Sequence, residues 1–119
     1  MSKFLQIIPV IPTSDIKRDL IWYAEKTGFE YAFGDDMYAG IRRDGQEIHL
    51  QWHADTEDDP LNGGSVIKIF VDDVETLFEE LVKRGTVKAN QLRKNTPWGT
   101  HEFGFFDLNQ NALFFVEDL

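Results

Sequence analysis

One order of secondary structure occurs twice along this 119-residue chain, and this repetition constrains the fold more than any other feature. In each half a β-rich segment leads into a helical pattern, and further β-rich segments follow. The halves cover residues 1–57 and 63–119, around a polar, acidic linker from Ala54 to Gly64. Self-similarity of this kind indicates a duplicated supersecondary unit. We therefore predict a single α+β domain, residues 1–119, made of two βαβββ modules.

Caps, turn residues and apolar periodicity set the expected boundaries. In the first half we expect a strand over Phe4 to Ile11, a helix from Ile16 to the stop at Gly28, and strands over Phe29 to Phe33, Tyr38 to Arg42 and Ile48 to Trp52. In the second half we expect a strand over Ser65 to Val71, a helix from Asp72 to Gly85, a weaker strand near Val87 to Leu92, and strands over His101 to Phe106 and Ala112 to Val116. A ferredoxin-like sandwich competes, but the Asp44-Gly45 hairpin adds strands that it does not contain.

Charge and composition narrow the range of partners. Twelve basic and 21 acidic residues give a formal charge of −9, which repels phosphate backbones and argues against a nucleic-acid partner. The chain has no cysteine, so disulfides, thiolate chemistry and Cys-ligated zinc are excluded. No stretch approaches the roughly 20 apolar residues of a membrane span, and the first residues show no cleavage-site pattern. We therefore expect a cytoplasmic protein that contacts no membrane.

Two segments resemble a known family. The first is Ile8-Pro9-Val10-Ile11-Pro12-Thr13-Ser14-Asp15-Ile16, with Trp22-Tyr23 and Gly28-Phe29 after it. The second is Pro97-Trp98-Gly99-Thr100-His101-Glu102-Phe103, with Asp107, Asn111 and Phe115 after it. Together with the turn Asp35 to Gly40, they resemble the glyoxalase/bleomycin-resistance (vicinal oxygen chelate) superfamily, and the Trp-Gly-x-x-Glu-Phe segment resembles its bleomycin-resistance branch. The resemblance implies a mixed, curved sheet with helices on its convex side, and a homodimer in which an N-terminal strand is sometimes exchanged.

The sequence departs from the family pattern in its last turn. The family has Asp-Pro-x-Gly-Asn before the final strand, whereas this chain has Asp107-Leu108-Asn109-Gln110-Asn111. If the turn keeps a positive φ where glycine normally stands, Gln110 carries strain of about 1 kcal/mol or more.

Enzymes of the family bind one divalent ion through His, Glu or Gln side chains. Counting from Asp15, Asp72 and the two hairpin turns, the corresponding metal positions are Ile8, His49, Val66 and Phe114. Three of these are hydrocarbon side chains, and a protein metal site needs three or four donors. We therefore predict no metal and no other cofactor.

The strand faces that would carry the metal in an enzyme mix aromatic and polar side chains, as small-molecule clefts do. The candidate ligand-binding residues are Phe33, Tyr38, His49, Gln51, Lys68, Phe70, Trp98 and Phe114. In bleomycin-resistance proteins, the aromatics matching Tyr38 and Trp98 flank a groove at the dimer interface in which a planar ring stacks. Trp98 could equally be a dimer-contact or loop-packing residue, and Tyr38 an ordinary strand aromatic. We expect Lys68 to pair with Glu47, to reach solvent or to meet an anionic ligand group.

Three functions follow, and the fold alone does not choose between them. The leading one is a non-catalytic homodimer that binds and sequesters a bleomycin-type glycopeptide or a similar planar ligand. The alternatives are a superfamily enzyme, such as a lyase or dioxygenase, with displaced ligands or metal-free chemistry, and a module that binds an unrelated metabolite.

Overall fold

The computed structural model describes all residues from 1 to 119. Two helices and seven strands form. They are β1 Val10–Thr13, α1 Ile16–Thr27, β2 Glu30–Gly34, β3 Tyr38–Arg43, β4 Gln46–Trp52, β5 Val66–Phe70, α2 Val74–Lys83, β6 Thr100–Phe106 and β7 Ala112–Asp118. No helix has the length and apolarity that crossing a membrane would need.

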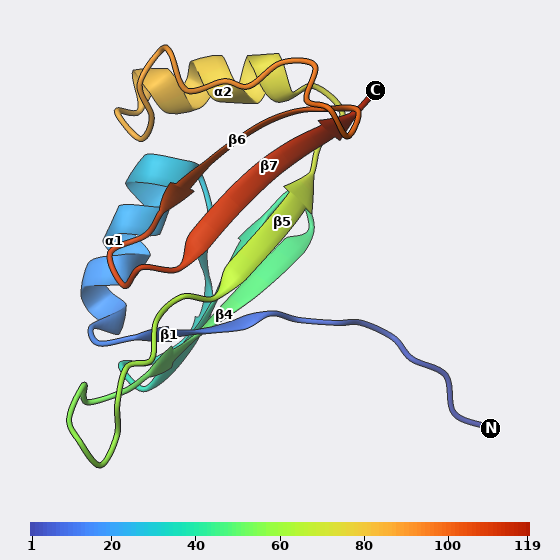
Figure 1. The fold of residues 1–119 in the computed structure, drawn as a ribbon. Coiled ribbons are helices and arrows are strands. Elements are labelled where there is room, and N and C mark those ends of the chain that lie inside the picture. The colour runs from blue at the N-terminus through green and yellow to red at the C-terminus, as the bar shows by residue number, and fades with distance from the viewer.

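The strands form two mixed sheets, one in each half of the chain. The first has the order β1-β4-β3-β2 and the second β5-β7-β6. In each sheet the strand before the helix pairs in parallel with the last strand of the module, and the remaining pairs are antiparallel. Helix α1 packs on the first sheet and α2 on the second (Figure 1). The α+β fold of two modules is thus confirmed, and the two sheets exclude the single four-stranded sheet of a ferredoxin-like sandwich.

Local chemistry explains the element ends. The Asp15 carboxylate accepts from the Arg18 N–H as the N-cap of α1, and Asp73 does the same for Thr76 in α2. Gly28 ends α1 with φ +76°. Asp44 and Gly45 both have positive φ between β3 and β4, as a two-residue type I′ hairpin requires.

The core lies between the sheets and their helices. Tyr23, Ile41 and Leu50 of the first module and Leu81, Phe103 and Leu113 of the second belong to one cluster of 15 buried residues. In β4, Ile48 and Leu50 are buried whereas their neighbours are not, so alternate residues face the core. In β7, Leu113 and Phe115 are buried, and Ala112 and Val116 on the other face are buried as well.

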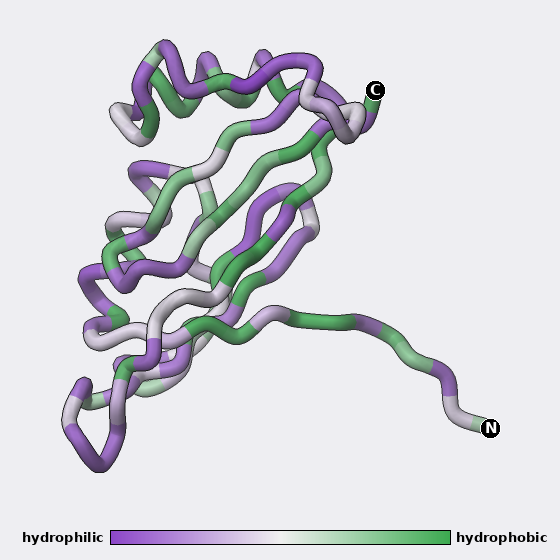
Figure 2. The backbone as a smooth tube through the Cα atoms, in the orientation of Figure 1, coloured by the Kyte–Doolittle hydropathy of each residue, from purple (hydrophilic) through white to green (hydrophobic).

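The first strand is shorter than predicted. Pairing begins only at β1, so the strand expected over Phe4 to Ile11 is wrong for residues 4–9. Residues 4–7 leave the body of the molecule (Figure 1), and Phe4, Leu5 and Ile7 are 101%, 85% and 91% exposed, whereas the Pro9 carbonyl still accepts from the His49 N–H. The alternating apolar pattern is present, but residues 4–7 pair with no strand of the same chain. Figure 2 shows this apolar segment standing away from the body. The Cα radius of gyration, 15.3 Å, accordingly exceeds the roughly 13.5 Å of a compact chain of this length.

The strand predicted near Val87 to Leu92 does not form. Only an isolated bridge between Arg93 and Glu102 follows α2 before β6, so the second sheet has three strands. Val87 and Leu92 are the only large apolar residues of that segment, and their odd spacing places them on opposite faces of any strand. Val87 is the one residue of this segment that is buried in the core, and residues 89–90 form a turn.

Candidate functional site

Three predicted ligand-binding residues gather on the first sheet. The Phe33 ring lies 5.0 Å from the His49 ring and 6.5 Å from the Tyr38 ring, and the Tyr38 and His49 rings are 5.3 Å apart. Register explains the grouping, because Gly40 pairs with both His49 and Phe33. A side chain at position 40 would collide with Phe33, since an added Cβ would lie 2.1 Å from its Cε1. Glycine therefore lets the Phe33 ring fold across the sheet toward His49.

A chain of hydrogen bonds runs through this group. The Tyr38 hydroxyl lies 2.7 Å from His49 Nδ1, and His49 Nε2 lies 3.0 Å from Glu47 Oε2. The other carboxylate oxygen of Glu47 accepts from Arg42 Nη2 at 2.7 Å. The hydrogen bond from His49 and then that from Arg42 lower the pKa of Glu47 below its ordinary value. Glu47 and Arg42 were not among the predicted site residues.

Three further predicted residues, Lys68, Phe70 and Phe114, lie on one face of the second sheet. Lys68 pairs with Phe114 across β5 and β7, and the Phe114 ring covers Gly104 much as Phe33 covers Gly40. Phe70 is 61% exposed. Lys68 is exposed and forms no ion pair, so it reaches solvent, one of the three outcomes expected for it.

Of the remaining two predicted residues, Gln51 lies beside the aromatic group and Trp98 lies apart from it. Gln51 is exposed and pairs with Tyr38 across β3 and β4. Trp98 is 57% exposed in the turn before β6, where its Nε1 donates to Glu102 at 3.2 Å and the Arg93 guanidinium lies 5.1 Å from its ring. No ring contact or hydrogen bond joins Trp98 to the Phe33–Tyr38–His49 group within one chain.

Two hollows lie between the modules. One, of about 410 Å³, is bounded by the N-terminal segment at Gln6, Ile7 and Pro9 and by Glu47, Lys68 and Phe70. Glu47 belongs both to this hollow and to the hydrogen-bond chain. Phe33, Tyr38 and His49 do not line this hollow, so only Glu47 relates it to the aromatic group.

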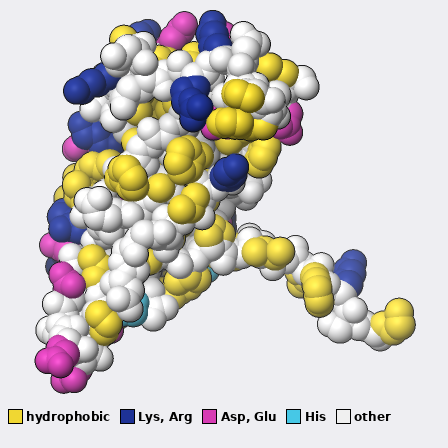
Figure 3. All heavy atoms as spheres, viewed as in Figure 1, with side chains coloured by type: hydrophobic (Ala, Val, Ile, Leu, Met, Phe, Trp, Pro, Cys, Tyr) yellow, Lys and Arg dark blue, Asp and Glu magenta, His cyan; other side chains and the backbone are white.

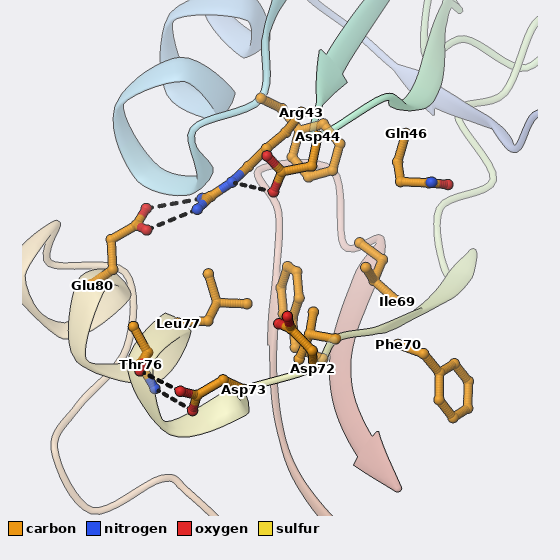
Figure 4. Close-up of a pocket in the computed structure, with 13 residues that line it drawn as sticks. Arg43, Asp44, Gln46, Ile69, Phe70, Asp72, Asp73, Thr76, Leu77 and Glu80 are labelled. Carbon is orange, nitrogen blue, oxygen red and sulfur yellow. Dashed lines mark hydrogen bonds and ion pairs between the residues drawn. The ribbon is translucent and has the colours of Figure 1, made fainter.

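The other hollow, of about 530 Å³, lies between the β3–β4 turn and the start of α2 (Figure 4). Arg43 binds Glu80 through two hydrogen bonds of 2.9 and 2.8 Å at one end. Asp73 accepts from Thr76 at the other. Among the predicted ligand-binding residues only Phe70 lines it. These polar groups already bind one another, and the Arg43–Glu80 pair joins the two modules.

Strand register relates the four metal-equivalent positions to one another. His49 pairs with Val10 as Phe114 pairs with Lys68, which makes Ile8 and Val66, two residues earlier in each case, equivalent as well. Ile8, Val66 and Phe114 offer hydrocarbon to this face. His53 binds Asp59, and His101 Nδ1 accepts from the Asn95 N–H. No group of three or more His, Asp or Glu side chains is placed to hold a metal ion.

Apolar side chains gather on the same side of the molecule. Val10, Val66, Phe70 and Phe106 are 46%, 63%, 61% and 63% exposed. They lie on strand faces opposite the helices, and Figure 3 shows hydrophobic side chains gathered on the body and along the N-terminal segment. Exposed apolar side chains gathered on one face are typical of interaction surfaces.

Paired modules of this topology, with an aromatic and polar face opposite the helices, define the glyoxalase-like class of α+β proteins. The chain matches the family model described as Glyoxalase/Bleomycin resistance protein/Dioxygenase superfamily over residues 5–115. The protein therefore belongs to this superfamily, as the sequence resemblance implied. The superfamily includes both binding proteins and enzymes.

Relatives and solved structures agree with this assignment. The bleomycin resistance protein of Geobacillus stearothermophilus is 25% identical over 129 residues, covering 97% of this chain and 98% of the relative, and that of Staphylococcus aureus gives the same values. The bleomycin-binding protein of Streptomyces verticillus, solved with copper(II)-bleomycin, is 25% identical with a TM-score of 0.75, covering 97% of each chain. A glyoxalase-related enzyme from Clostridium phytofermentans has a TM-score of 0.78 at 16% identity, covering 99% of this chain and 98% of its own, and it shares the fold.

Proposed function

We propose that the protein binds a bleomycin-type glycopeptide, or a similar planar ligand, and sequesters it without breaking a bond. The observation that carries the proposal is the aromatic group of Phe33, Tyr38 and His49, with Phe33 40% exposed, beside the acidic Glu47. Aromatic faces stack on planar heterocycles, each contact contributing about 0.5–1.5 kcal/mol beyond area. The −9 formal charge attracts a cationic ligand. The bleomycin-resistance relatives, aligned over nearly their whole length, support the same ligand class.

The proposed binding unit is a homodimer. Trp98 makes no contact with the Phe33 group of its own chain, so the groove needs Trp98 from a second copy. Phe4, Leu5 and Ile7 are exposed along an unpaired segment, and β1 and β5 are both sheet edges. A second copy would cover this apolar segment and a free edge together. We propose that the N-terminal segments are exchanged between the two chains.

The enzyme alternative is not favoured by the side chains present. The metal-equivalent positions hold one imidazole and three hydrocarbons, so the family's metal chemistry lacks its donors. Metal analysis of protein purified without chelators tests this alternative. A stoichiometric divalent ion would count against a purely binding role.

The proposal extends to organisation and location. We propose that residues 1–57 and 63–119 are the two repeated modules of one domain, because Val10 and Lys68 have matching parallel pairings in the two sheets. We propose a cytoplasmic location, because sequestration has to intercept the drug before it reaches DNA. Cell fractionation tests the location.

Calorimetry with metal-free bleomycin tests ligand binding directly. Trp98→Ala is expected to weaken binding about tenfold, since an aromatic face and its buried area are both lost. Ile21→Ala is the matched control, because Ile21 is also an exposed apolar residue, 61% exposed, but lies on α1. Absence of binding heat with the unmodified protein at high micromolar bleomycin contradicts the proposed function.

Sedimentation equilibrium tests the dimer. Removing residues 1–7 is expected to raise the dimer dissociation constant strongly, because Phe4, Leu5 and Ile7 are almost fully exposed within their own chain. Ile7→Asp should have the same direction of effect with a single substitution. An unmodified protein that stays monomeric at micromolar concentration would contradict the exchange.

A further inference from the structure

Four side chains of the first sheet form one linear chain of hydrogen bonds. Arg42 contacts Glu47 at 2.7 Å, Glu47 contacts His49 at 3.0 Å, and His49 contacts Tyr38 at 2.7 Å. The side chains of Glu47 and His49 are only 11% and 17% exposed, whereas that of Arg42 is 59% exposed. The series of hydrogen bonds thus begins at the solvent-exposed Arg42, passes through the largely buried Glu47 and His49, and ends at the phenol of Tyr38.

The direction of every hydrogen bond in this chain follows from its first member. A guanidinium can only donate, and an ionised carboxylate can only accept. Both oxygens of Glu47 are therefore acceptors, and His49 must donate to Glu47 from Nε2–H. A neutral imidazole carries one proton, so Nδ1 is then an acceptor. The Tyr38 hydroxyl has no other hydrogen-bond partner in the protein, and it donates its proton to His49 Nδ1.

We propose that Arg42, Glu47 and His49 are positioning residues that hold Tyr38 as an obligate hydrogen-bond acceptor, so that the ligand presents an N–H or O–H donor beside its planar ring. This inference rests on the proposed function and specifies the ligand chemistry of the same site. With the hydroxyl proton committed to His49, only the oxygen lone pairs of Tyr38 remain for a ligand. Phe33, 6.5 Å away ring to ring, supplies the neighbouring face for stacking. The site would thus select rings that carry amide, amino or ammonium groups over rings edged with acceptors.

A single isosteric substitution should reverse the direction of the hydrogen bonds between Glu47, His49 and Tyr38. In Glu47→Gln the amide oxygen accepts from Arg42, and the amide nitrogen donates to His49 Nε2. The imidazole proton then moves to Nδ1 and is donated to Tyr38, whose own proton turns toward the ligand. Glu30→Gln is the matched control, because Glu30 pairs with Arg42 across β2 and β3 but has no place in the chain. It loses the same charge near the same site.

The first measurement needs no ligand. Nitrogen-15 chemical shifts of the free protein at pH 8 report which ring nitrogen of His49 carries the proton. We expect Nε2–H in the unmodified protein and in Glu30→Gln, and Nδ1–H in Glu47→Gln. Resonances are assigned with His49→Gln. An Nδ1–H tautomer in the unmodified protein overturns the proposal, as does an unchanged tautomer in Glu47→Gln.

The second measurement is a double-mutant cycle on binding of metal-free bleomycin at pH 8. Tyr38→Phe keeps the ring and removes the acceptor, so binding should weaken about fivefold, the usual effect of one hydrogen bond. Glu47→Gln should weaken binding at least as much, although Glu47 acts only through His49. In the Tyr38→Phe background, Glu47→Gln should have no further effect beyond that of Glu30→Gln. Additive effects overturn the polarity argument, because a purely structural role for Glu47 would not depend on the Tyr38 hydroxyl.

The two proposals can fail separately. No bleomycin heat with the unmodified protein contradicts the proposed function, while the tautomer measurement still decides the polarity of Tyr38. Bleomycin binding that Tyr38→Phe leaves unchanged overturns the inference and leaves the proposed function standing.

Discussion

The phenol of Tyr23 donates a hydrogen bond of 2.6 Å to Asp107, and both residues are buried. Tyr23 belongs to the first module and Asp107 to the turn before the last strand of the second. The Asp107 carboxylate also accepts from the backbone N–H groups of Asn109 and Asn111 and from the Asn111 amide. The Tyr23–Asp107 hydrogen bond therefore joins the two modules. The Asp107 carboxylate accepts four hydrogen bonds in all.

Replacing Tyr23 with Phe should lower the free energy of unfolding by about 1.5–3 kcal/mol at pH 7, the usual range for a buried hydrogen bond to a charged group. Burial and then the neighbouring charge of Asp107 raise the pKa of Tyr23 above its ordinary range. Above about pH 10 the unfolded chain therefore loses a proton that the native chain keeps. Stability should fall there by about 1.4 kcal/mol per pH unit from this group.

Urea unfolding from pH 7 to 11 measures both effects of Tyr23→Phe. The destabilisation caused by the substitution should shrink above about pH 10, because the variant lacks the ionising group. Tyr31→Phe is the control, since Tyr31 is exposed and its hydroxyl donates only to the Gly34 carbonyl. A destabilisation by Tyr23→Phe that does not change with pH would contradict the assignment.

The parts of the fold that sequence could predict are those fixed by local chemistry. Asp44-Gly45 fixes a two-residue hairpin, and Gly28 and Asp15 fix the ends of α1. A two-residue hairpin also fixes register, so the pairs Arg42 with Glu47 and Gly40 with His49 follow from the turn alone. That signal would have added Arg42 and Glu47 to the candidate site.

Other features depend on what a segment meets in space. The residues before β1 have a strand-like pattern, yet Phe4 and Leu5 find no partner strand in their own chain. The distance between Trp98 and Tyr38 depends on how the modules, and in the proposed dimer the two chains, are arranged. Apolar periodicity contains no information on that arrangement.

The ion pair between Arg43 and Glu80 should stabilise the protein only while Glu80 is ionised. Hydrogen bonds from Arg43, in the first place, lower the pKa of Glu80 below its ordinary value. Because the native pKa of Glu80 is lowered, its ionised form stabilises the protein above about pH 4.3, and this stabilisation is lost as the pH falls further. Glu80→Gln should therefore lower the free energy of unfolding by about 1 kcal/mol at pH 7, because solvent screens the ion pair of a side chain that is 35% exposed.

Thermal unfolding between pH 3 and 7 tests this prediction. The difference between Glu80→Gln and the unmodified protein should approach zero toward pH 3. Glu79→Gln, an exposed neighbour on α2, removes the same charge and should change stability by less than about 0.5 kcal/mol. Equal effects of the two substitutions would mean that the Arg43 contact contributes nothing.

Gly40→Ala should impair ligand binding more than folding. The added methyl group would collide with the Phe33 ring, which is 40% exposed and can swing outward. We expect stability to fall by about 1 kcal/mol, and bleomycin binding to weaken about fivefold because one stacking face moves. In a Phe33→Ala background, Gly40→Ala should cause no further loss of binding. Calorimetry on the four proteins measures this coupling, and independent effects would place the methyl group's action elsewhere.

Gln110→Gly should stabilise the protein. Gln110 has φ +65°, so the positive φ considered from the sequence is present in this turn. A non-glycine residue in this region costs about 1–2 kcal/mol, and glycine loses about 0.5–1 kcal/mol through its greater freedom in the unfolded chain. The expected net gain is about 0.5–1 kcal/mol, measured as an increase in the urea midpoint at constant slope. Gln110→Ala keeps the strain and should give no gain. A Gly variant no more stable than the Ala variant would show that contacts in the Asp107–Asn111 turn already offset the strain at position 110.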